Sequence, residues 1–130
     1  MSPESPKPIL RGDIFWIEPD ESRGSIPGRP HPHVVVQDNV FNRSRLTSVI
    51  VCALSTNAKL FNEPGNVLVK VGEGNLTKES VVVVSQLSSV HKNRLGQYIG
   101  ILSAERVDQV LAGLRFQQSS FLHQARARDA

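Results

Sequence analysis

Cysteine and long hydrophobic runs are nearly missing from this sequence of 130 residues. The single cysteine, Cys52, cannot form an internal disulfide, and its place in the apolar run SVIVCAL predicts a small buried residue. No window approaches the roughly 18 apolar residues that a membrane span needs. The opening stretch MSPESPKPIL is rich in proline and lacks the apolar core of a secretory signal, so we expect a flexible arm over residues 1–10 and a cytoplasmic protein.

Charge of one sign is in small excess, because the formal net charge is only +3 at pH 7. Such a balance is compatible with an anionic partner such as nucleic acid but does not require one. The 39% of hydrophobic residues suffices for a compact core, and 130 residues are too few for two comfortable domains. We therefore expect one globular domain.

The hydrophobic residues that are present gather in short, mostly β-branched runs between turn signals. Short connections without long intervening helices favour an antiparallel, barrel-like sheet over a doubly wound one. Between the second and third runs, NVFNRSRL predicts a turn with room for one helical turn. Five to six strands are predicted, in RGDIFWIEP (11–19), HVVVQD (33–38), TSVIVCAL (47–54), VLVKV (67–71), ESVVVVSQL (79–87) and YIGIL (98–102).

The end of the chain changes to a helical period. Ser103 is a good N-cap, and Glu105 in the first turn favours the positive end of the helix dipole. We expect the helix to fray at QARARDA. The apolar stripe along it comprises Val107, Val110, Leu111, Leu114 and Phe121.

The strand entry PGRPHPHVVVQDN, residues 27–39, carries two histidines. His31 and His33 are two residues apart, so on a strand their side chains point to the same face. They can share a zinc ion, but no third ligand lies at a recognisable spacing. Acid–base chemistry suits them better, because histidine titrates near neutral pH and Arg29 can add a fixed cation for a phosphate. The candidates for a third zinc ligand are His91, Asp38 and Cys52. The alternative to both a zinc site and acid–base chemistry is a polar strand entry with no catalytic or binding role.

Two loops offer further polar groups. SRGSIPGR contains Ser22, Arg23 and Ser25 with backbone N–H groups that can contact phosphates, although a merely solvated loop is the commoner case. LSTN, Leu54–Asn57, places hydroxyl groups and an amide where a buried strand ends. Strand ends often carry functional groups, and they equally often carry hydrogen-bonded turns.

The order and spacing of several segments resemble the MazF/PemK/Kid family, the endoribonuclease toxins of bacterial toxin–antitoxin systems. The resemblance covers roughly residues 11–116, nearly the whole chain. No single motif is decisive, but the ordered set is specific. The segments are RGDIFWIEPDESRGS, VVVQDNVFNRSRL, VIVCALSTN, EPGNVLV, SVVVVSQLSSVHKNRLGQYIGILS and RVDQVLAGLRF.

The resemblance implies a fold, an activity and partners. The fold is a small SH3-like antiparallel β-barrel of the MazF/CcdB kind with a C-terminal helix, over residues 11–118, followed by a frayed or disordered tail at 119–130. The implied protein is a homodimer that cuts single-stranded RNA without a metal or other cofactor, by attack of a 2′-hydroxyl that leaves a 2′,3′-cyclic phosphate and a 5′-hydroxyl. A MazE-like antitoxin whose disordered tail folds on binding neutralises it, and the complex binds operator DNA.

One segment departs from the family pattern. In an ungapped alignment anchored by Gly24–Ser25 and Val34–Gln37, the Arg of the family's RPVVV-like segment falls on His31 and its Pro on Pro32. A second Arg-Pro pair begins at Arg29, two residues nearer the loop. The resemblance therefore implies His31 as general base or acid, with Arg29 approaching the phosphate from the loop.

The family's second catalytic segment, TSN-like, matches LSTN and puts Ser55 at the hydroxyl position. A subset of relatives uses an Asp before the Gln of the fifth strand, but here Ser85 precedes Gln86 and that carboxylate is missing. We thus expect Ser55 to hydrogen-bond the phosphate. The residues expected to contact RNA are Ser22, Arg23, Ser25, His33, Thr56, Asn57 and Gln86.

Two other functions remain open at this point. The departure at His31 is compatible with a chain that keeps the fold and antitoxin binding but has lost cleavage. The same barrel also carries toxins that poison DNA gyrase, which the segments resemble less well.

Overall fold

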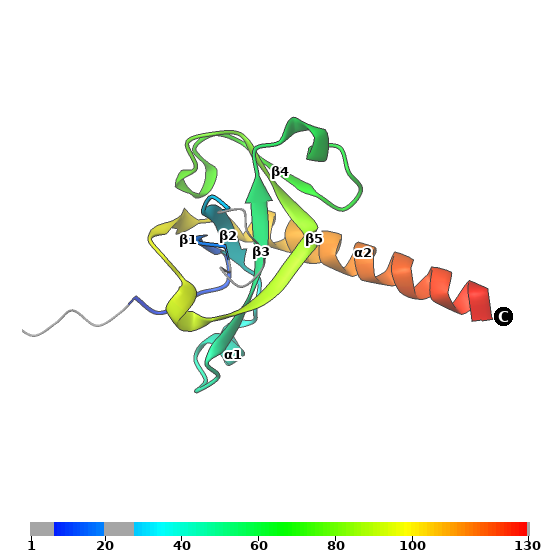
Figure 1. Cartoon of the computed structure of the whole chain (residues 1–130), viewed down its shortest axis with the longest axis horizontal. Helices are drawn as coiled ribbons and strands as arrows, with labels where there is room; N and C mark the ends of the chain where they lie inside the picture. Colours follow the sequence, from blue (N-terminus) through cyan, green and yellow to red (C-terminus); the bar gives the residue numbers. More distant parts are fainter. Residues whose placement is uncertain (1–6, 20–27, 130) are drawn as a thin grey trace, which may run out of the picture.

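The computed structural model describes residues 7–19 and 28–129, with side chains described as far as Ser119. Six strands pair antiparallel in one curled sheet, in the order β4-β5-β3-β2-β1-β6, and one long helix lies against it (Figure 1). This confirms the predicted mainly β, barrel-like fold with a C-terminal helix. The elements are β1 (Asp13–Ile17), β2 (His31–Val35), α1 (Asn39–Asn42), β3 (Ser48–Ser55), η2 (Ala58–Leu60), β4 (Val67–Val69), η3 (Glu73–Asn75), β5 (Ser80–His91), η4 (Lys92–Arg94), β6 (Tyr98–Ile101) and α2 (Ala104–Asp129).

The sheet is open between its two edge strands, β4 and β6, and the η3 turn crosses the opening. Asn75 Nδ2 donates a hydrogen bond to the Ile99 carbonyl of β6 at 3.0 Å. Gly74 and Gly100 pack backbone to backbone, so a Cβ at Gly100 would collide with the Gly74 carbonyl oxygen. Glycine is required at Gly100 for this close approach.

Strands β1, β2 and β3 alternate their side chains between two hydrophobic clusters, one on each face of the sheet. Ile14 and Val34 belong to the larger cluster, which α2 covers, whereas Phe15 and Val35 belong to a smaller cluster on the opposite face. The two histidines of β2 share the face of Val35, since they lie two and four residues before it. The site therefore lies away from the main core.

Strands β2 and β5 differ from their predicted bounds. β2 begins at His31 rather than His33 and ends at Val35, because Asp38 instead caps α1, accepting from the Val40 N–H at 2.9 Å. β5 continues to His91, beyond the predicted end at Leu87. The polar residues beyond Leu87 were not included in the predicted strand, but they pair with the first half of β3 and so complete the sheet.

The pairing of β5 with β3 is interrupted by a bulge. Leu54 pairs with Val82 and Cys52 pairs with Leu87. The chain therefore advances five residues along β5 where it advances only two along β3. The extra residues of β5 include Gln86. A bulge of this kind bends a strand and turns side chains in new directions, and alternation alone does not predict where Gln86 points.

Helix α2 begins as predicted, with the Ser103 hydroxyl accepting the Arg106 N–H at 3.2 Å. Val110 and Leu114 of the predicted stripe are buried, with Val107 and Leu111 packed beside them. The side chain of Phe121 lies outside the described residues. The helical backbone continues to Asp129 and extends beyond the barrel (Figure 1).

The start of the described chain is in contact with the barrel. Lys7 Nζ forms an ion pair with Asp13, whose side chain is fully buried, and lies 4.7 Å from the centre of the Tyr98 ring. Ile9 packs against the smaller hydrophobic cluster. The division into an arm at 1–10, a domain at 11–118 and a tail at 119–130 stays a prediction.

Candidate active site

A cavity of about 520 Å³ opens on the face of the sheet that carries the histidines. The ends of β1, β2 and β3 form one side of it, and the second half of β5 with η4 forms the other. Five of the sequence-predicted site residues line it. These are His31, His33, Ser55, Asn57 and Gln86.

His31 and Ser55 come to the cavity from neighbouring strands. His33 pairs with Ala53 across β2 and β3, and His31 and Ser55 each lie two residues beyond that pair. On the other flank, His31 pairs with Ile17 of β1. His31 and Ser55 thus line the same cavity.

The ring of His33 is held in one tautomer. Its Nδ1 lies 2.8 Å from the carbonyl oxygen of His31. A carbonyl oxygen only accepts hydrogen bonds, so Nδ1 carries the proton and Nε2 of the neutral ring is the free acceptor. Burial lowers the pKa of His33 from 6.5, and the charges of His31 and Arg94 act in the same direction, against the backbone hydrogen bond, which raises it.

Ser55 and Asn57 form a hydrogen-bonded turn at the end of β3. The Ser55 hydroxyl accepts the Asn57 N–H at 3.1 Å, and the Asn57 side chain accepts the Lys59 N–H at 3.1 Å, which caps η2. Because its oxygen accepts from the backbone, Ser55 keeps its own O–H free to donate to a ligand. The residues that form this turn, Ser55 and Asn57, are therefore also residues that line the cavity. Thr56 is exposed and does not line the cavity.

Arg94 is a residue of the cavity that sequence analysis missed. It ends η4, and its Nη2 donates to the Glu18 carbonyl at 2.7 Å, which draws η4 toward the end of β1. Its charge is near enough to depress the pKa of His33. The sequence analysis assigned no strand to the polar segment SSVHKNRLGQ, whereas the structure extends β5 to His91 and places Arg94 in the same cavity as the histidines.

Arg29 and the predicted residues of the preceding loop are not among the described residues that line the cavity. Arg29 is exposed and does not line the cavity. Ser22, Arg23 and Ser25 lie outside the described residues. The assignment of all these residues to catalysis or RNA binding stays a prediction.

The residues considered as third zinc ligands do not join the histidines. Cys52 pairs with Val34 on the opposite face, and burial raises the pKa of its thiol to about 12. Asp38 caps α1, and His91 caps η4 by accepting the Asn93 N–H at 3.1 Å. Among the described residues, no three His, Cys, Asp or Glu side chains are placed to hold one metal ion. The expected absence of a metal stays a prediction.

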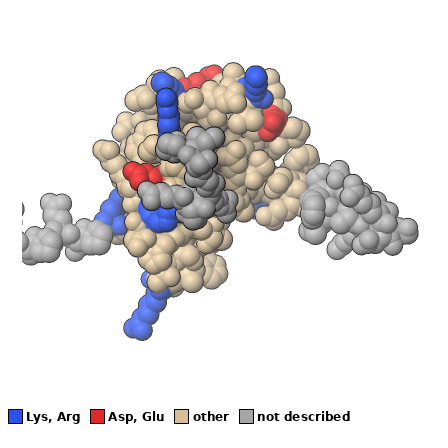
Figure 2. All heavy atoms as spheres, in the orientation of Figure 1, with Lys and Arg blue, Asp and Glu red and all other residues tan. Residues whose placement is uncertain are grey.

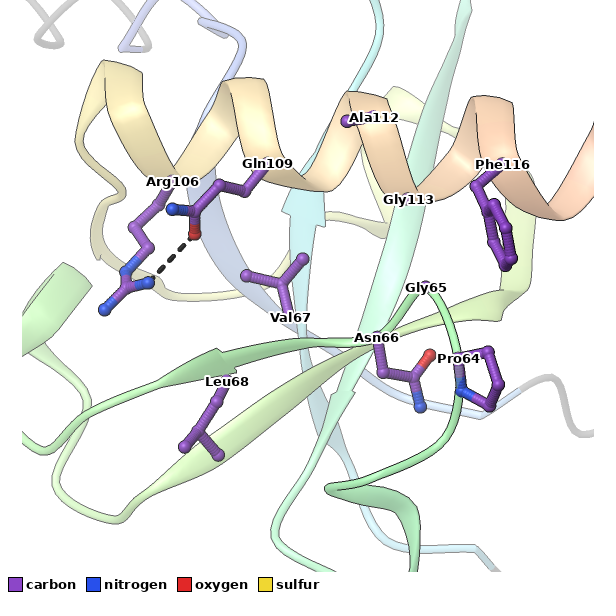
Figure 3. A pocket seen from close by; sticks show the side chains of 10 residues that line it. All are labelled: Pro64, Gly65, Asn66, Val67, Leu68, Arg106, Gln109, Ala112, Gly113 and Phe116. Atoms are coloured by element: carbon purple, nitrogen blue, oxygen red, sulfur yellow. Dashed lines mark hydrogen bonds between the residues drawn. The ribbon is translucent and has the colours of Figure 1, made fainter.

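A second cavity, about 560 Å³ in volume, lies between β4 and α2 (Figure 3). Arg106 reaches into it but is engaged, donating to Glu73 Oε1 at 2.8 Å and to Gln109 Oε1 at 2.9 Å. The hydrogen bond from Arg106 also lowers the pKa of Glu73. The lining of this cavity contains no histidine, serine or threonine, so it lacks the acid–base groups of the first.

Charged side chains on the face shown in Figure 2 are dispersed rather than gathered. Lys and Arg lie around the barrel with Asp and Glu between them. Within the described ranges, no helix is both long and apolar enough to cross a membrane.

Comparisons with known proteins agree with this geometry. The fold is similar to the MazE–MazF structure of Deinococcus radiodurans, with a TM-score of 0.71 at 18% identity over 87% of this chain and 97% of that one. It is also similar to a mycobacterial endoribonuclease in complex with its cognate antitoxin, with a TM-score of 0.69 at 20% identity over 85% and 95%. Residues 10–117 match the model of the PemK-like, MazF-like toxins of type II toxin–antitoxin systems.

The chain belongs to this family. Within the PemK/MazF family, endoribonuclease MazF6 of Mycobacterium tuberculosis is 33% identical over 107 residues, covering 82% of this chain and 94% of that protein. Endoribonuclease MazF of Staphylococcus saprophyticus is 29% identical over 102 residues, 78% and 84% of the two chains. The predicted endoribonuclease toxin is thereby confirmed over a cleavage-deficient partner and a gyrase poison.

Proposed function

We propose that the cavity containing His31, Ser55 and Arg94 cuts single-stranded RNA by attack of a 2′-hydroxyl on the neighbouring phosphate, without a metal ion. The products are a 2′,3′-cyclic phosphate and a 5′-hydroxyl. The observation that carries the proposal is that His31 and Ser55 line the same cavity, together with Arg94. His31 and Ser55 are the two positions at which the family resemblance puts catalytic residues.

The reaction makes three demands that the cavity meets. A base must take the 2′-OH proton, an acid must protonate the leaving 5′-oxygen, and donors must hold the charge that develops on the phosphate. His31 supplies acid–base chemistry. The Ser55 O–H and the Arg94 guanidinium supply donors, and an arginine fork matches two phosphate oxygens at once. Gln86 adds an amide for a base or a phosphate.

The partners and the compartment follow from the same proposal. Two solved relatives are named as toxin–antitoxin complexes, which supports a MazE-like antitoxin as partner. The proposal also includes an antitoxin that blocks the cavity and a homodimer with the RNA groove across its interface. We propose that Arg29, with Ser22, Arg23 and Ser25 of the preceding loop, contacts RNA. Operator DNA binding by the complex and a cytoplasmic location complete the proposal.

The test is cleavage of a long RNA of known sequence by the purified protein in excess EDTA. We expect cuts at one short sequence, with cyclic phosphate and 5′-hydroxyl ends identified by mass spectrometry. A His31→Ala/Ser55→Ala double variant purified in the same way controls for contaminating nuclease. Cleavage that appears only after a divalent cation is restored, or that the double variant shows equally, would contradict the proposal.

A further inference from the structure

His33 is a titratable group of the cavity for which the family resemblance implies no catalytic task. In the family's RPVVV-like segments the residue after Pro is valine, whereas this chain has HPHVV. The structure puts His33 inside the same cavity as His31. Two substitutions to histidine, two residues apart on one strand face, have therefore introduced a pair of imidazoles.

The hydrogen bonding of His33 prepares it to accept a proton. With Nδ1 donating to the His31 carbonyl at 2.8 Å, Nε2 of the neutral ring has a free lone pair. The charged or titratable groups that face it are His31 from β2, Arg94 from η4 and Glu18 after β1, while β3 and β5 contribute Ala53 and uncharged polar groups. Burial and the cations keep the ring neutral near pH 7 by lowering its pKa, although the backbone hydrogen bond opposes them.

The strand spacing of the two histidines is compatible with a phosphate between their side chains. Residues two apart on a strand are separated by about 6.6 Å, which leaves room for a phosphate with the attacking oxygen on one side and the leaving oxygen on the other. His31 is the more exposed of the two and lines the cavity with Ser55. His33 is less exposed, and Arg94 is near enough to lower its pKa.

We infer that His33 is a catalytic residue that removes the 2′-OH proton at Nε2, while His31 as imidazolium protonates the leaving 5′-oxygen. The 2′-oxygen forms a bond to phosphorus as the bond from phosphorus to the 5′-oxygen breaks. His33 ends the step protonated and His31 neutral, and exchange of one proton with water restores both. This inference rests on the proposed ribonuclease activity and deepens it.

The test uses an oligonucleotide containing the mapped cleavage site, in which the leaving 5′-oxygen is replaced by sulfur. A thiolate leaves without needing a proton, so an acid is dispensable for this substrate and a base is not. On ordinary RNA, His31→Ala and His33→Gln are each expected to lower kcat by about 10²–10⁴-fold. On the 5′-thio substrate, His31→Ala should recover a rate close to that of the wild type, whereas His33→Gln should stay defective.

The pH profile gives a second readout. A base must be unprotonated, so wild-type activity should fall as pH drops through the pKa of His33, below 6.5. That acidic limb should vanish in His33→Gln. Binding of an RNA with a 2′-deoxy nucleotide at the cut site, measured for each variant, shows that the site still folds. His91→Asn, which can keep the cap of η4, is the matched histidine control and should retain full activity.

Three results would overturn the inference. Full activity of His33→Gln on ordinary RNA would remove His33 from the reaction. Rescue of His33→Gln rather than His31→Ala by the 5′-thio substrate would reverse the two roles. A His31→Ala defect that persists on the 5′-thio substrate would exclude His31 as the acid. A wild-type protein that leaves every RNA intact is a separate outcome, because it removes the proposed function itself and the inference with it.

Discussion

Replacing His31 by alanine is expected to lower kcat for ordinary RNA by about 10²–10⁴-fold, the usual contribution of a positioned acid or base. The imidazole lines the cavity together with Ser55, where the proposed cleavage requires a proton to move. KM should change little, because the phosphate donors Ser55 and Arg94 remain. Single-turnover cleavage of an oligonucleotide with one mapped site measures the effect.

The same measurement distinguishes His31 from Arg29. Arg29 lies two residues earlier and outside the cavity lining, so Arg29→Ala should affect kcat much less than His31→Ala. Full activity of His31→Ala would exclude this histidine from the mechanism and would favour Arg29 as the catalytic residue instead.

Replacing Arg94 by alanine is expected to lower kcat/KM by about 10²–10³-fold, the usual cost of removing one donor that stabilises charge in a transition state. The guanidinium is fixed by the Glu18 carbonyl at 2.7 Å and lies near His33. It is therefore already oriented before RNA arrives. Arg94→Lys keeps the charge but loses the fork of donors, so it should recover only part of the activity.

Arg115→Ala is the matched control, because this exposed arginine lies on α2 and not in the cavity. It removes the same charge from the protein. Equal losses in Arg94→Ala and Arg115→Ala would show that only overall charge matters, and would contradict a local role. Loss of the Arg94 cation should also raise the pKa of His33, which moves the acidic limb of the rate profile to higher pH.

The fold could be predicted from the sequence wherever strands follow simple alternation. β1 and β3 bury the apolar residues that define them, and Ser103 marks the start of α2. β5 was predicted too short because its second half is polar. Pairing with β3, rather than burial, keeps that half in the sheet, and pairing partners far apart in sequence leave no local signal.

The site was predictable in part for the same reasons. His31 and His33 share a face by strand spacing, and Ser55 marks a strand end. Arg94 was missed because its place depends on the length of β5 and on its bond to Glu18, 76 residues away. The fixed tautomer of His33 depends on a backbone contact that the residue pattern does not contain.

The most direct test of the central claim replaces one 2′-hydroxyl by hydrogen. An oligonucleotide with a single 2′-deoxy nucleotide at the mapped cut site lacks the proposed nucleophile, while its phosphate and bases are unchanged. We predict that the wild-type protein binds it as tightly as the all-RNA oligonucleotide and does not cut that bond. Cleavage of the deoxy-substituted bond at the RNA rate would contradict 2′-hydroxyl attack and, with it, the proposed role of this cavity.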